Sequence, residues 1–331
     1  MALYHGDAVP LPEKELISRI RRVAASARSH RVLTGIGDDC AVLRLPRGHE
    51  MLVTTDFSLE GIHFRRDWHS PESVGHRCLA RGLSDIAAMG GEPIAAFLSL
   101  ALPREVPQTW VEAFMKALTK MSKRHGVVLA GGDTAQSPTG ILADIVVVGS
   151  VRKGKAVLRS TARPGDRIYV SGDLGGSAAT VIKMERMPNQ KLNPSEYPRH
   201  FAPEPRIGLG RYLREKNLAN SMIDTSDGLS TDLAHICEES DVGAIVNGDR
   251  IPRAWVGRPA HEVDLNLALH GGEDYELLFT VPSRKRIPRE VAGVPLTQIG
   301  EITKSRKIFL RNTDGSTRAL EARGWEHFRG K

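Results

Sequence analysis

Aspartates that stand beside glycines and hydroxyl residues are the part of this sequence best suited to chemistry. Four segments place an aspartate at the end of a strand-like run or inside a glycine-rich loop, and a fifth places one within a helical pattern. The five segments are Gly35-Ile-Gly-Asp-Asp-Cys40, Thr54-Thr-Asp56, Gly131-Gly-Asp133, Ile223-Asp-Thr-Ser-Asp-Gly228 and, in the helix, Leu83-Ser-Asp85. Glycine lets the backbone approach a ligand closely, and carboxylates suit hard cations such as Mg²⁺. Together they indicate an enzyme that binds metal ions and phosphate groups.

Each segment also has a purely structural interpretation. Aspartate beside glycine most often marks a turn. Asp85 can pair with Arg81 at i,i+4 spacing on its helix, and Asp224 and Asp227 can cap a helix that begins near Gly228. Turns do not require a hydroxyl residue beside each carboxylate, so the recurrence of that combination favours a site.

Two common ways of binding nucleotide phosphates are excluded by the sequence. It contains no GxxxxGK[ST] loop, and the HRD and DFG motifs of protein kinases are both absent. Gly35-Ile-Gly37 matches a fragment of a dinucleotide fingerprint, but Asp38 and Asp39 would repel a pyrophosphate. If nucleotide phosphates bind here, metal ions must bridge them to the carboxylates.

The elements that position these residues alternate between helices and strands in both halves of the chain. Hydrophobic periodicity predicts helices and short β-branched strands in the first half. The expected helices cover 13–27, 71–89 and 106–125, and the expected strands cover 51–55 running into Asp56, 94–102, 127–130 and 141–151.

A charged stretch covers residues 152–166 and ends in the turn-forming sequence Arg-Pro-Gly-Asp, which indicates a linker. Beyond it we expect helices from about 176, at 206–215 and at 228–239, and strands at 167–171, 243–246, 276–281 and 307–310. The sequence therefore predicts two α/β domains, 1–151 and 152–331.

Composition limits the classes of partner. The 331 residues carry a net charge of +7 and a pI of about 9.4, but basic residues are dispersed and aromatics make up 5%, which argues against nucleic acid. No apolar run reaches the length of a membrane span, and the N-terminus has no secretory h-region. The widely spaced Cys40, Cys78 and Cys237 argue against a cysteine-based zinc site and favour a cytoplasmic protein.

Seven motifs taken in order resemble those of the thiamine-monophosphate kinases, which belong to the aminoimidazole ribonucleotide synthetase-like superfamily. The resemblance runs from about Gly35 to Phe328. The motifs are Gly35-Ile-Gly-Asp-Asp-Cys-Ala41, Thr54-Thr-Asp-Phe57 with Gly61-Ile-His-Phe64, Leu83-Ser-Asp-Ile-Ala-Ala-Met-Gly-Gly91, Gly131-Gly-Asp-Thr134, Gly172-Asp-Leu-Gly-Gly-Ser177, Ile223-Asp-Thr-Ser-Asp-Gly-Leu229 and Gly271-Gly-Glu-Asp-Tyr-Glu-Leu277. Each motif alone is weak, whereas seven in order are specific.

The resemblance implies a two-domain α/β fold of α+β type. It implies an N-terminal domain that binds ATP and Mg²⁺ and pairs with its twin in a homodimer to form a shared β-barrel. The C-terminal α/β domain would complete the active site. The implied reaction is the ATP-dependent phosphorylation of thiamine monophosphate to thiamine diphosphate.

The resemblance also implies roles for individual residues. The residues implied to hold several Mg²⁺ ions are Asp39, Thr54, Thr55, Asp56, Asp85, Asp133, Asp224 and Asp227. Those implied to contact ATP are Gly132, Asp133, Arg159 and Ser226. Those implied to contact thiamine monophosphate are His63, Glu273 and Trp325. Three of these residues have structural alternatives: His63 can be a loop histidine, Trp325 can belong to the core, and Arg159 can pair with an exposed carboxylate.

The expected chemistry needs no general base. The acceptor is a phosphate monoester with a second pKa of about 6, so it is already a dianion at pH 7. The obstacle is repulsion between two anions, which Mg²⁺ and an arginine such as Arg159 would relieve during direct in-line transfer. The alternatives are another enzyme of the superfamily, such as a selenophosphate-type synthetase, and a basic nucleic-acid-binding protein. The first 34 residues contain no cysteine, which argues against the synthetase.

Overall fold

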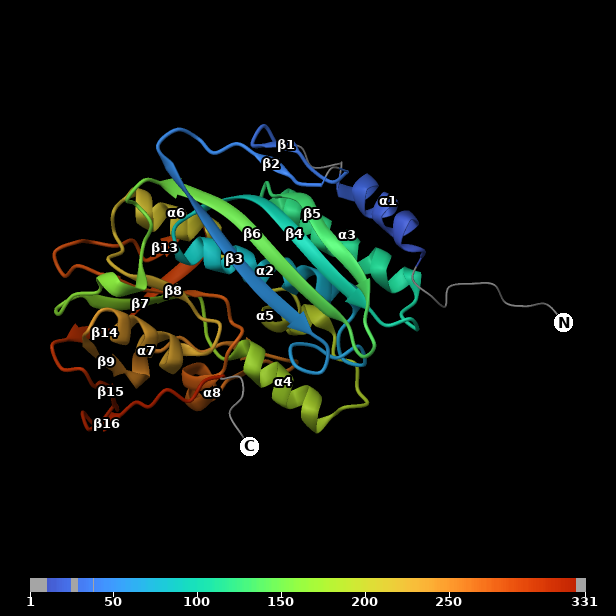
Figure 1. Ribbon diagram of the computed structural model, residues 1–331. Coiled ribbons are helices and arrows are strands. Elements are labelled where there is room, and N and C mark those ends of the chain that lie inside the picture. The colour runs from blue at the N-terminus through green and yellow to red at the C-terminus, as the bar shows by residue number, and fades with distance from the viewer. Residues whose placement is uncertain (1–10, 25–28, 38, 326–331) are drawn as a thin grey trace. The chain divides into compact units, whose positions relative to one another are not determined.

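The computed structural model describes residues 11–24, 29–37 and 39–325. Its contacts divide the chain into two units, and Figure 1 shows the elements of both. Unit 1 comprises Met1–Ile86 and Glu92–Lys153, and unit 2 comprises Ala87–Gly91 and Gly154–Lys331. Each unit is described separately.

Unit 1 is built on a four-stranded sheet of order β3-β6-β4-β5. Its strands are β3 (His49–Leu59), β6 (Leu142–Arg152), β4 (Glu92–Leu102) and β5 (Val128–Gln136). The β3–β6 and β4–β6 pairs are antiparallel, and β4–β5 is parallel. Within the described residues this sheet is open, so one chain by itself forms no barrel.

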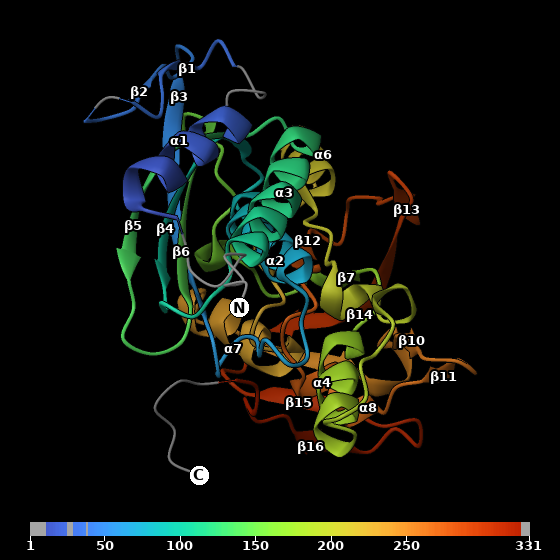
Figure 2. The same cartoon turned by 90° about the vertical axis from the view of Figure 1, so that its right-hand side faces the viewer.

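Helices α2 (Pro71–Ala88) and α3 (Gln108–Arg124) cover one face of this sheet (Figure 2). Leu79 and Leu83 of α2 and Phe114 and Leu118 of α3 are fully buried. From Met51 to Ser58 along β3 the even-numbered side chains are shielded and the odd-numbered ones are exposed, as expected for a strand with one covered face. Helix α1 (Glu13–Ala24) and the small β1–β2 pair (Val32–Thr34, Val42–Leu43) complete the unit.

Unit 2 is built on an eight-stranded sheet of order β16-β15-β9-β14-β7-β12-β8, with β13 paired to β14. The strands are β7 (Arg167–Ser171), β8 (Met222–Asp224), β9 (Gly243–Asn247), β12 (Leu277–Val281), β13 (Glu290–Val291), β14 (Val294–Thr303), β15 (Ile308–Arg311) and β16 (Thr317–Ala319). The β9–β15 pair is parallel, and the other pairs are antiparallel.

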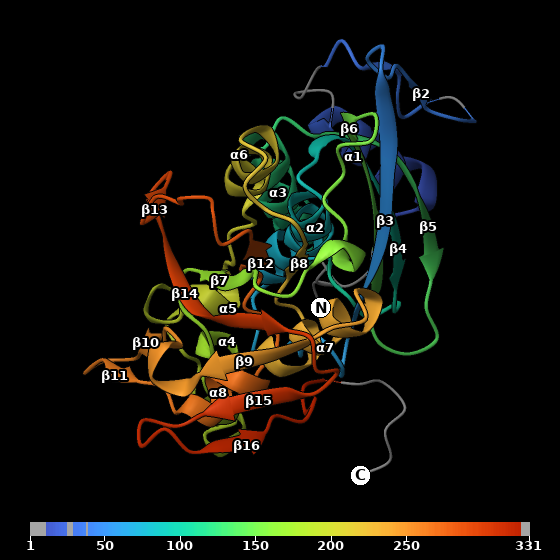
Figure 3. The same cartoon turned by 90° about the vertical axis from the view of Figure 1, so that its left-hand side faces the viewer.

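Both faces of this sheet are covered, as Figure 3 shows. Ile168, Val170 and Leu278 join one apolar cluster with α7 (Leu229–Glu239) and α8 (Leu265–His270). The alternate residues Tyr169 and Phe279 join the other cluster with α6 (Ile207–Glu215). Successive side chains along each strand therefore point to opposite faces of the sheet and pack into two different apolar cores.

The remaining elements of unit 2 are short, apart from α4. They are α4 (Gly176–Arg186), α5 (Pro198–Phe201), the hairpin β10 (Trp255–Val256) with β11 (His261–Glu262), and 3₁₀ turns at Arg159–Thr161, Pro194–Glu196 and Gly248–Arg250. None of the described helices is long and apolar enough to cross a membrane.

The predicted two-domain α/β class is confirmed, but two strand ends were predicted wrongly. Strand β3 continues through Asp56 to Leu59, and β5 continues through Gly131, Gly132 and Asp133 instead of ending at Ala130. Glycines are weak strand formers, which is why the pattern indicated a loop. Only glycine fits at position 132, because the backbone φ there is 145° and a Cβ atom would lie 1.8 Å from the Leu98 carbonyl oxygen.

Eight of the described strands were missed: the ten-residue β14, and seven strands of two or three residues each (β1, β2, β8, β10, β11, β13 and β16). Strand β14 contains Pro295 and Gly300, which hide its pattern, although it pairs with both β7 and β9. Strand β8 is only three residues long. The predicted helix 13–27 is described as α1 to Ala24, and residues 25–27 lie outside the described residues.

Candidate active site

An acidic set lies between β3 and α2 in unit 1. Thr54 and Asp56 stand on the shielded side of β3, and the Thr54 hydroxyl donates a hydrogen bond to Asp85 of α2. Burial, followed by the negative charge of Asp85, raises the pKa of Asp56 to about 7, while Arg81 acts in the opposite direction. The structure thus brings together three of the residues implied to hold Mg²⁺.

Thr55 and Asp133 lie on the opposite face of the same sheet. The Thr55 hydroxyl donates to Asp144 Oδ1 at 2.7 Å. In the sheet register Asp144 is opposite Ser99, and Ser99 is opposite Asp133, so these three side chains share a face. The sequence did not single out Asp144, because it lies inside an apolar strand with no adjacent glycine.

A cavity of about 580 Å³ in unit 1 joins Asp39 to the Gly132-Asp133 pair. Apolar side chains, including Ile17, Phe97 and Leu129, form its other walls. Its size and its mixture of apolar walls with a few polar groups are typical of small-molecule sites. A larger cavity of about 750 Å³ is lined by residues of α1 and α3 and lies away from these motifs.

His63 is held in the loop after β3. The Leu59 backbone N–H donates to His63 Nδ1 at 3.0 Å, and Arg77 approaches the His63 carbonyl oxygen at 3.5 Å. A backbone N–H can only donate, so Nδ1 must be the acceptor nitrogen of the ring. In the neutral ring the proton is therefore on Nε2.

Unit 2 gathers three separate predicted segments around the loop that precedes α7. Asp224 ends β8, and Ser226 and Asp227 follow it. The Glu273 N–H donates to the Ser226 carbonyl at 2.8 Å, and the Trp325 N–H donates to the Asp227 carbonyl at 3.0 Å. Within unit 2, Glu273 and Trp325 therefore adjoin the loop of Ser226 and Asp227.

Asp232, one turn into α7, is a third carboxylate at this loop. It is buried, and the Gly228 N–H donates to its Oδ2 at 3.0 Å. Burial and then the charges of Asp224 and Asp227 raise its pKa well above the ordinary value. The motifs did not single it out, although a hydroxyl residue, Thr231, precedes it just as Ser84 precedes Asp85.

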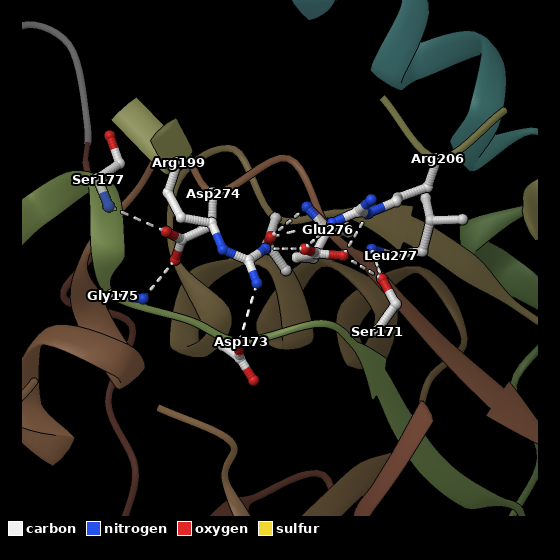
Figure 4. A network of polar contacts seen from close by, with 10 residues as sticks. Ser171, Asp173, Gly175, Ser177, Arg199, Arg206, Asp274, Glu276 and Leu277 are labelled. Carbon is white, nitrogen blue, oxygen red and sulfur yellow. Dashed lines mark hydrogen bonds and ion pairs between the residues drawn. The ribbon is translucent and has the colours of Figure 1, made fainter. Parts of the chain in front are cut away.

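A buried polar network fixes the segment that carries Glu273 (Figure 4). Glu276 binds Arg199 and Arg206 and accepts from the Ser171 hydroxyl at 2.6 Å. Burial alone would raise the pKa of Glu276, but the two arginines hold it below the ordinary value. Asp274 accepts from the backbone N–H groups of Gly175 at 2.6 Å and Ser177 at 3.2 Å, and so caps α4.

This network explains an unusual backbone. Glu273 and Tyr275 have φ values of 65° and 52°, a left-handed conformation that is uncommon for residues other than glycine. The next residues in the chain, Asp274 and Glu276, each form hydrogen bonds through their side chains to two or more partners. Anchoring on both sides of Tyr275 holds the strained segment in place.

Arg159 lies apart from the loop at Asp227. Its carbonyl oxygen accepts from the hydroxyl of Ser240, which caps the C-terminus of α7. Asp227 precedes the other end of this 11-residue helix, a length of roughly 16 Å. Within unit 2, the Arg159 backbone is therefore separated from Ser226 and Asp227 by about the length of α7.

The carboxylates fit the mode in which proteins bind Mg²⁺ with phosphate. Among the described residues, no three His, Cys, Asp or Glu side chains converge into a ready-made metal cage. Mg²⁺ commonly takes one or two carboxylates and completes its octahedron with water and phosphate oxygens. Asp232 Oδ1 is buried and, within the part of the chain that the structure describes, has no hydrogen-bond partner, which fits a polar ligand at this site.

Comparisons with known proteins identify the family of the chain. Residues 37–151 match the family model for the N-terminal domain of AIR synthase related proteins, and residues 163–311 match the model for the C-terminal domain. Thiamine-monophosphate kinase of Escherichia coli K12 is 40% identical over 94% of this chain and 97% of its own length.

Solved structures give the same result. The crystal structure of thiamine-monophosphate kinase from Stenotrophomonas maltophilia K279a superposes with a TM-score of 0.78 at 32% identity, covering 95% of this chain and 99% of that one. The structure of AaThiL complexed with AMPPCP and TMP superposes with a TM-score of 0.74 at 31% identity, covering 96% and 97%. The resemblance drawn from the motifs is confirmed, and the chain belongs to the thiamine-monophosphate kinase family of AIR synthase related proteins.

Proposed function

We propose that this protein transfers the γ-phosphoryl group of ATP to thiamine monophosphate, giving thiamine diphosphate and ADP. The observation that carries the proposal is the loop at Ser226 and Asp227, which hydrogen-bonds to the backbone of both Glu273 and Trp325. A metal-binding loop that also holds two substrate residues suits an enzyme joining two phosphorylated partners. The family relationship, including a relative complexed with AMPPCP and TMP, supports the same assignment.

ATP is assigned to the groups around the 580 Å³ cavity. Asp39, Gly132 and Asp133 line it, and its apolar walls suit a flat heteroaromatic base. Ser226 and Arg159 are the further proposed ATP contacts. Because Arg159 lies a helix length from Asp227, we assign it to a different part of the nucleotide from Ser226.

Mg²⁺ is assigned to the two acidic sets. The proposed ligands in unit 1 are Asp39, Thr54, Thr55, Asp56, Asp85 and Asp133, and those in unit 2 are Asp224 and Asp227. When bound, Mg²⁺ would neutralise phosphate charge and orient the reacting groups. Thr54 and Thr55 hold Asp85 and Asp144 respectively through their hydroxyls, which orients carboxylates on both faces of the sheet.

Thiamine monophosphate is assigned to His63, Glu273 and Trp325. Because His63 Nδ1 accepts from the Leu59 N–H, Nε2 is the donor nitrogen of the neutral ring. Trp325 is half exposed and offers an aromatic face to a heteroaromatic ligand. No residue is assigned as a general base, since the acceptor phosphate is already a dianion at pH 7.

We further propose a cytoplasmic homodimer that pairs through the outer face of the unit 1 sheet. Met51, Val53 and Phe57 are exposed along β3, an apolar stripe of the kind that marks an interaction site. A second copy of this face would supply the remaining strands of the barrel that the resemblance implies.

The proposal is tested with purified protein, ATP, Mg²⁺ and thiamine monophosphate. Formation of thiamine diphosphate is expected, and free thiamine serves as the control acceptor. Phosphorylation of free thiamine in preference to the monophosphate would overturn the acceptor. With a chiral γ-phosphoryl group we expect inversion at phosphorus, whereas net retention would indicate a covalent intermediate.

A further inference from the structure

The fold explains the position of only one of the two carboxylate oxygens of Asp232. Its side chain is 1% exposed, and Oδ2 accepts a hydrogen bond from the Gly228 N–H at the start of α7. Oδ1 is equally buried, yet it has no hydrogen-bond partner among the described residues. The backbone N–H groups of Gly228 and Asp227 both favour the charged form of the carboxylate, but the only hydrogen bond formed within the described part of the chain goes to Oδ2, from Gly228. Buried polar atoms almost always have a partner, so an orphaned carboxylate oxygen calls for a ligand or an ordered water.

The surroundings make this oxygen still harder to explain by folding alone. The strongest charges that act on Asp232 are those of Asp224 and Asp227, and both are negative. Gly228, whose N–H holds Oδ2, directly follows Asp227, so the Asp232 carboxylate lies beside that loop. Placing three acidic groups together is unfavourable unless a cation or a proton compensates them.

Helix capping accounts for one oxygen and not for the other. The N-cap of α7 is Gly228, which has no side chain, and Oδ2 of Asp232 serves the backbone there. An asparagine could fill that role with its amide oxygen. Capping therefore gives no reason for a full carboxylate with a second, buried oxygen.

The first turn of α7 is rigid enough to hold a precise position. The Thr231 hydroxyl accepts from the Gly324 N–H at 2.9 Å, and the Ser230 hydroxyl bonds to His270 Nδ1 at 2.8 Å. The same C-terminal segment continues to Trp325, which hydrogen-bonds to Asp227. The turn that carries Asp232 is thus tied to the loop that carries Asp227.

We propose that Asp232 is a positioning residue whose Oδ1 accepts a hydrogen bond from a water molecule on the Mg²⁺ held by Asp224 and Asp227. Mg²⁺ keeps several of its waters in proteins, and partners of this outer kind typically alter metal affinity 10- to 100-fold. The inference rests on the proposed metal role of Asp224 and Asp227. It adds a residue whose carboxylate orients the ion through water without touching it.

The test is a titration of the full-length protein with Mn²⁺ as a paramagnetic substitute for Mg²⁺, followed by electron paramagnetic resonance without ATP or thiamine monophosphate. Asp232→Asn should weaken Mn²⁺ binding at one site at least tenfold. The matched control is Asp166→Asn. Asp166 is also a buried acid of unit 2, but its Oδ2 accepts from the Arg163 N–H and the Asn220 side chain. The control should bind Mn²⁺ within twofold of the wild type.

A double-mutant cycle separates a shared site from independent damage. If Asp232 acts through the ion of Asp224, adding Asp232→Asn to Asp224→Asn should cause little further loss of Mn²⁺ affinity. If the losses of Mn²⁺ affinity in the two single variants multiplied in the double variant, the inference would be overturned. Wild-type Mn²⁺ affinity in Asp232→Asn would also overturn it. If the asparagine variant does not fold, Asp232→Ser, which leaves room for a water, should show the same weakening. Wild-type affinity in that variant would equally overturn the inference.

Kinase activity supplies the second measurement. Asp232→Asn should need at least tenfold more Mg²⁺ for half-maximal rate, and high Mg²⁺ should restore most of the wild-type rate, which a misfolded enzyme would not show. A wild-type protein that forms no thiamine diphosphate would overturn the proposed function, while the Mn²⁺ result would still decide the role of Asp232.

Discussion

At the scale of single residues, the aspartates differ by what surrounds them. Asp274 is buried with both oxygens accepting backbone N–H groups, which is the environment of a structural carboxylate. Asp133 is exposed on β5 and accepts from the N–H of Thr134 at 2.8 Å. A side chain exposed in this way contributes little to folding, so a large effect of its substitution must come from ligand binding.

Asp133→Asn is therefore expected to lower kcat/KM on the order of 100-fold, because one carboxylate for the metal–phosphate complex is lost. The free energy of unfolding should change by less than about 0.5 kcal/mol. Steady-state kinetics and urea unfolding measure the two quantities. Asp67→Asn is the control, since Asp67 is also an exposed acid of unit 1 and pairs with Arg65. If the unfolding free energy fell by as much as the loss of kcat/KM corresponds to in free energy, the assignment would be refuted.

Asp274 gives a prediction about pH. Burial raises its pKa from 3.8 to about 7, although the N–H groups of Gly175 and Ser177 oppose the shift. A group with a raised folded-state pKa binds its proton more tightly when folded, so its stabilising contribution is complete below about pH 4 and is lost as the pH rises to about 7. The difference in unfolding free energy between the wild type and Asp274→Asn should therefore shrink from pH 4 to pH 7 and stay constant above. A constant difference throughout would contradict this.

At the scale of elements, the segment before β12 shows how a site is held. Glu276 pairs with β7 through Ser171 and with Arg199 and Arg206, which lie in α5 and just before α6. These contacts tie three elements to the strand that follows Glu273. The left-handed backbone at Glu273 is thus maintained by packing beyond its own segment, since local preference would oppose it.

Glu276→Gln is expected to destabilise the protein by about 3–5 kcal/mol, because two arginines would lose the buried charge that pairs with them. Asp241→Asn removes an exposed pair with Arg306 and should cost less than about 1 kcal/mol. Urea unfolding of both variants provides the comparison. Similar small losses in both would mean that the buried network does not support the segment.

At the scale of the whole molecule, the outer face of the unit 1 sheet bears on the oligomeric state. Val53 is 62% exposed in the middle of β3, with Met51 and Phe57 on the same face. Trp255, on the β10–β11 hairpin of unit 2, is 65% exposed and lies in a different unit. The two positions therefore offer equally exposed apolar side chains for comparison.

Val53→Glu should convert the proposed dimer to a monomer, because it buries an unpaired charge in the interface. Trp255→Glu should leave the oligomeric state unchanged. Sedimentation velocity over a range of concentrations distinguishes the two outcomes. A wild type that sediments as a monomer at all concentrations, or a Val53→Glu variant that remains dimeric, would exclude this face as the interface.

The sequence by itself determined the elements and the chemistry. Periodicity predicted the longer helices and, except for β14, every described strand of four or more residues, because local patterns of apolar residues report which side of an element is buried. The ordered acidic motifs indicated metal and phosphate chemistry and carried the family resemblance. Strand β14 escaped prediction, since Pro295 and Gly300 obscure its pattern and its place between β7 and β9 depends on distant partners.

Only the tertiary structure decided which of the acidic residues act together. Alternation along β3 directs Asp56 toward Asp85 of α2 on one face of the sheet and Thr55 toward Asp144 on the other, although Thr55 and Asp56 are adjacent in the chain. The length of α7 separates the Arg159 backbone from Asp227, and its first turn brings Asp232 to the loop that carries Asp227. Such proximities arise from pairing and packing between segments far apart in the sequence, which no local pattern of residues encodes.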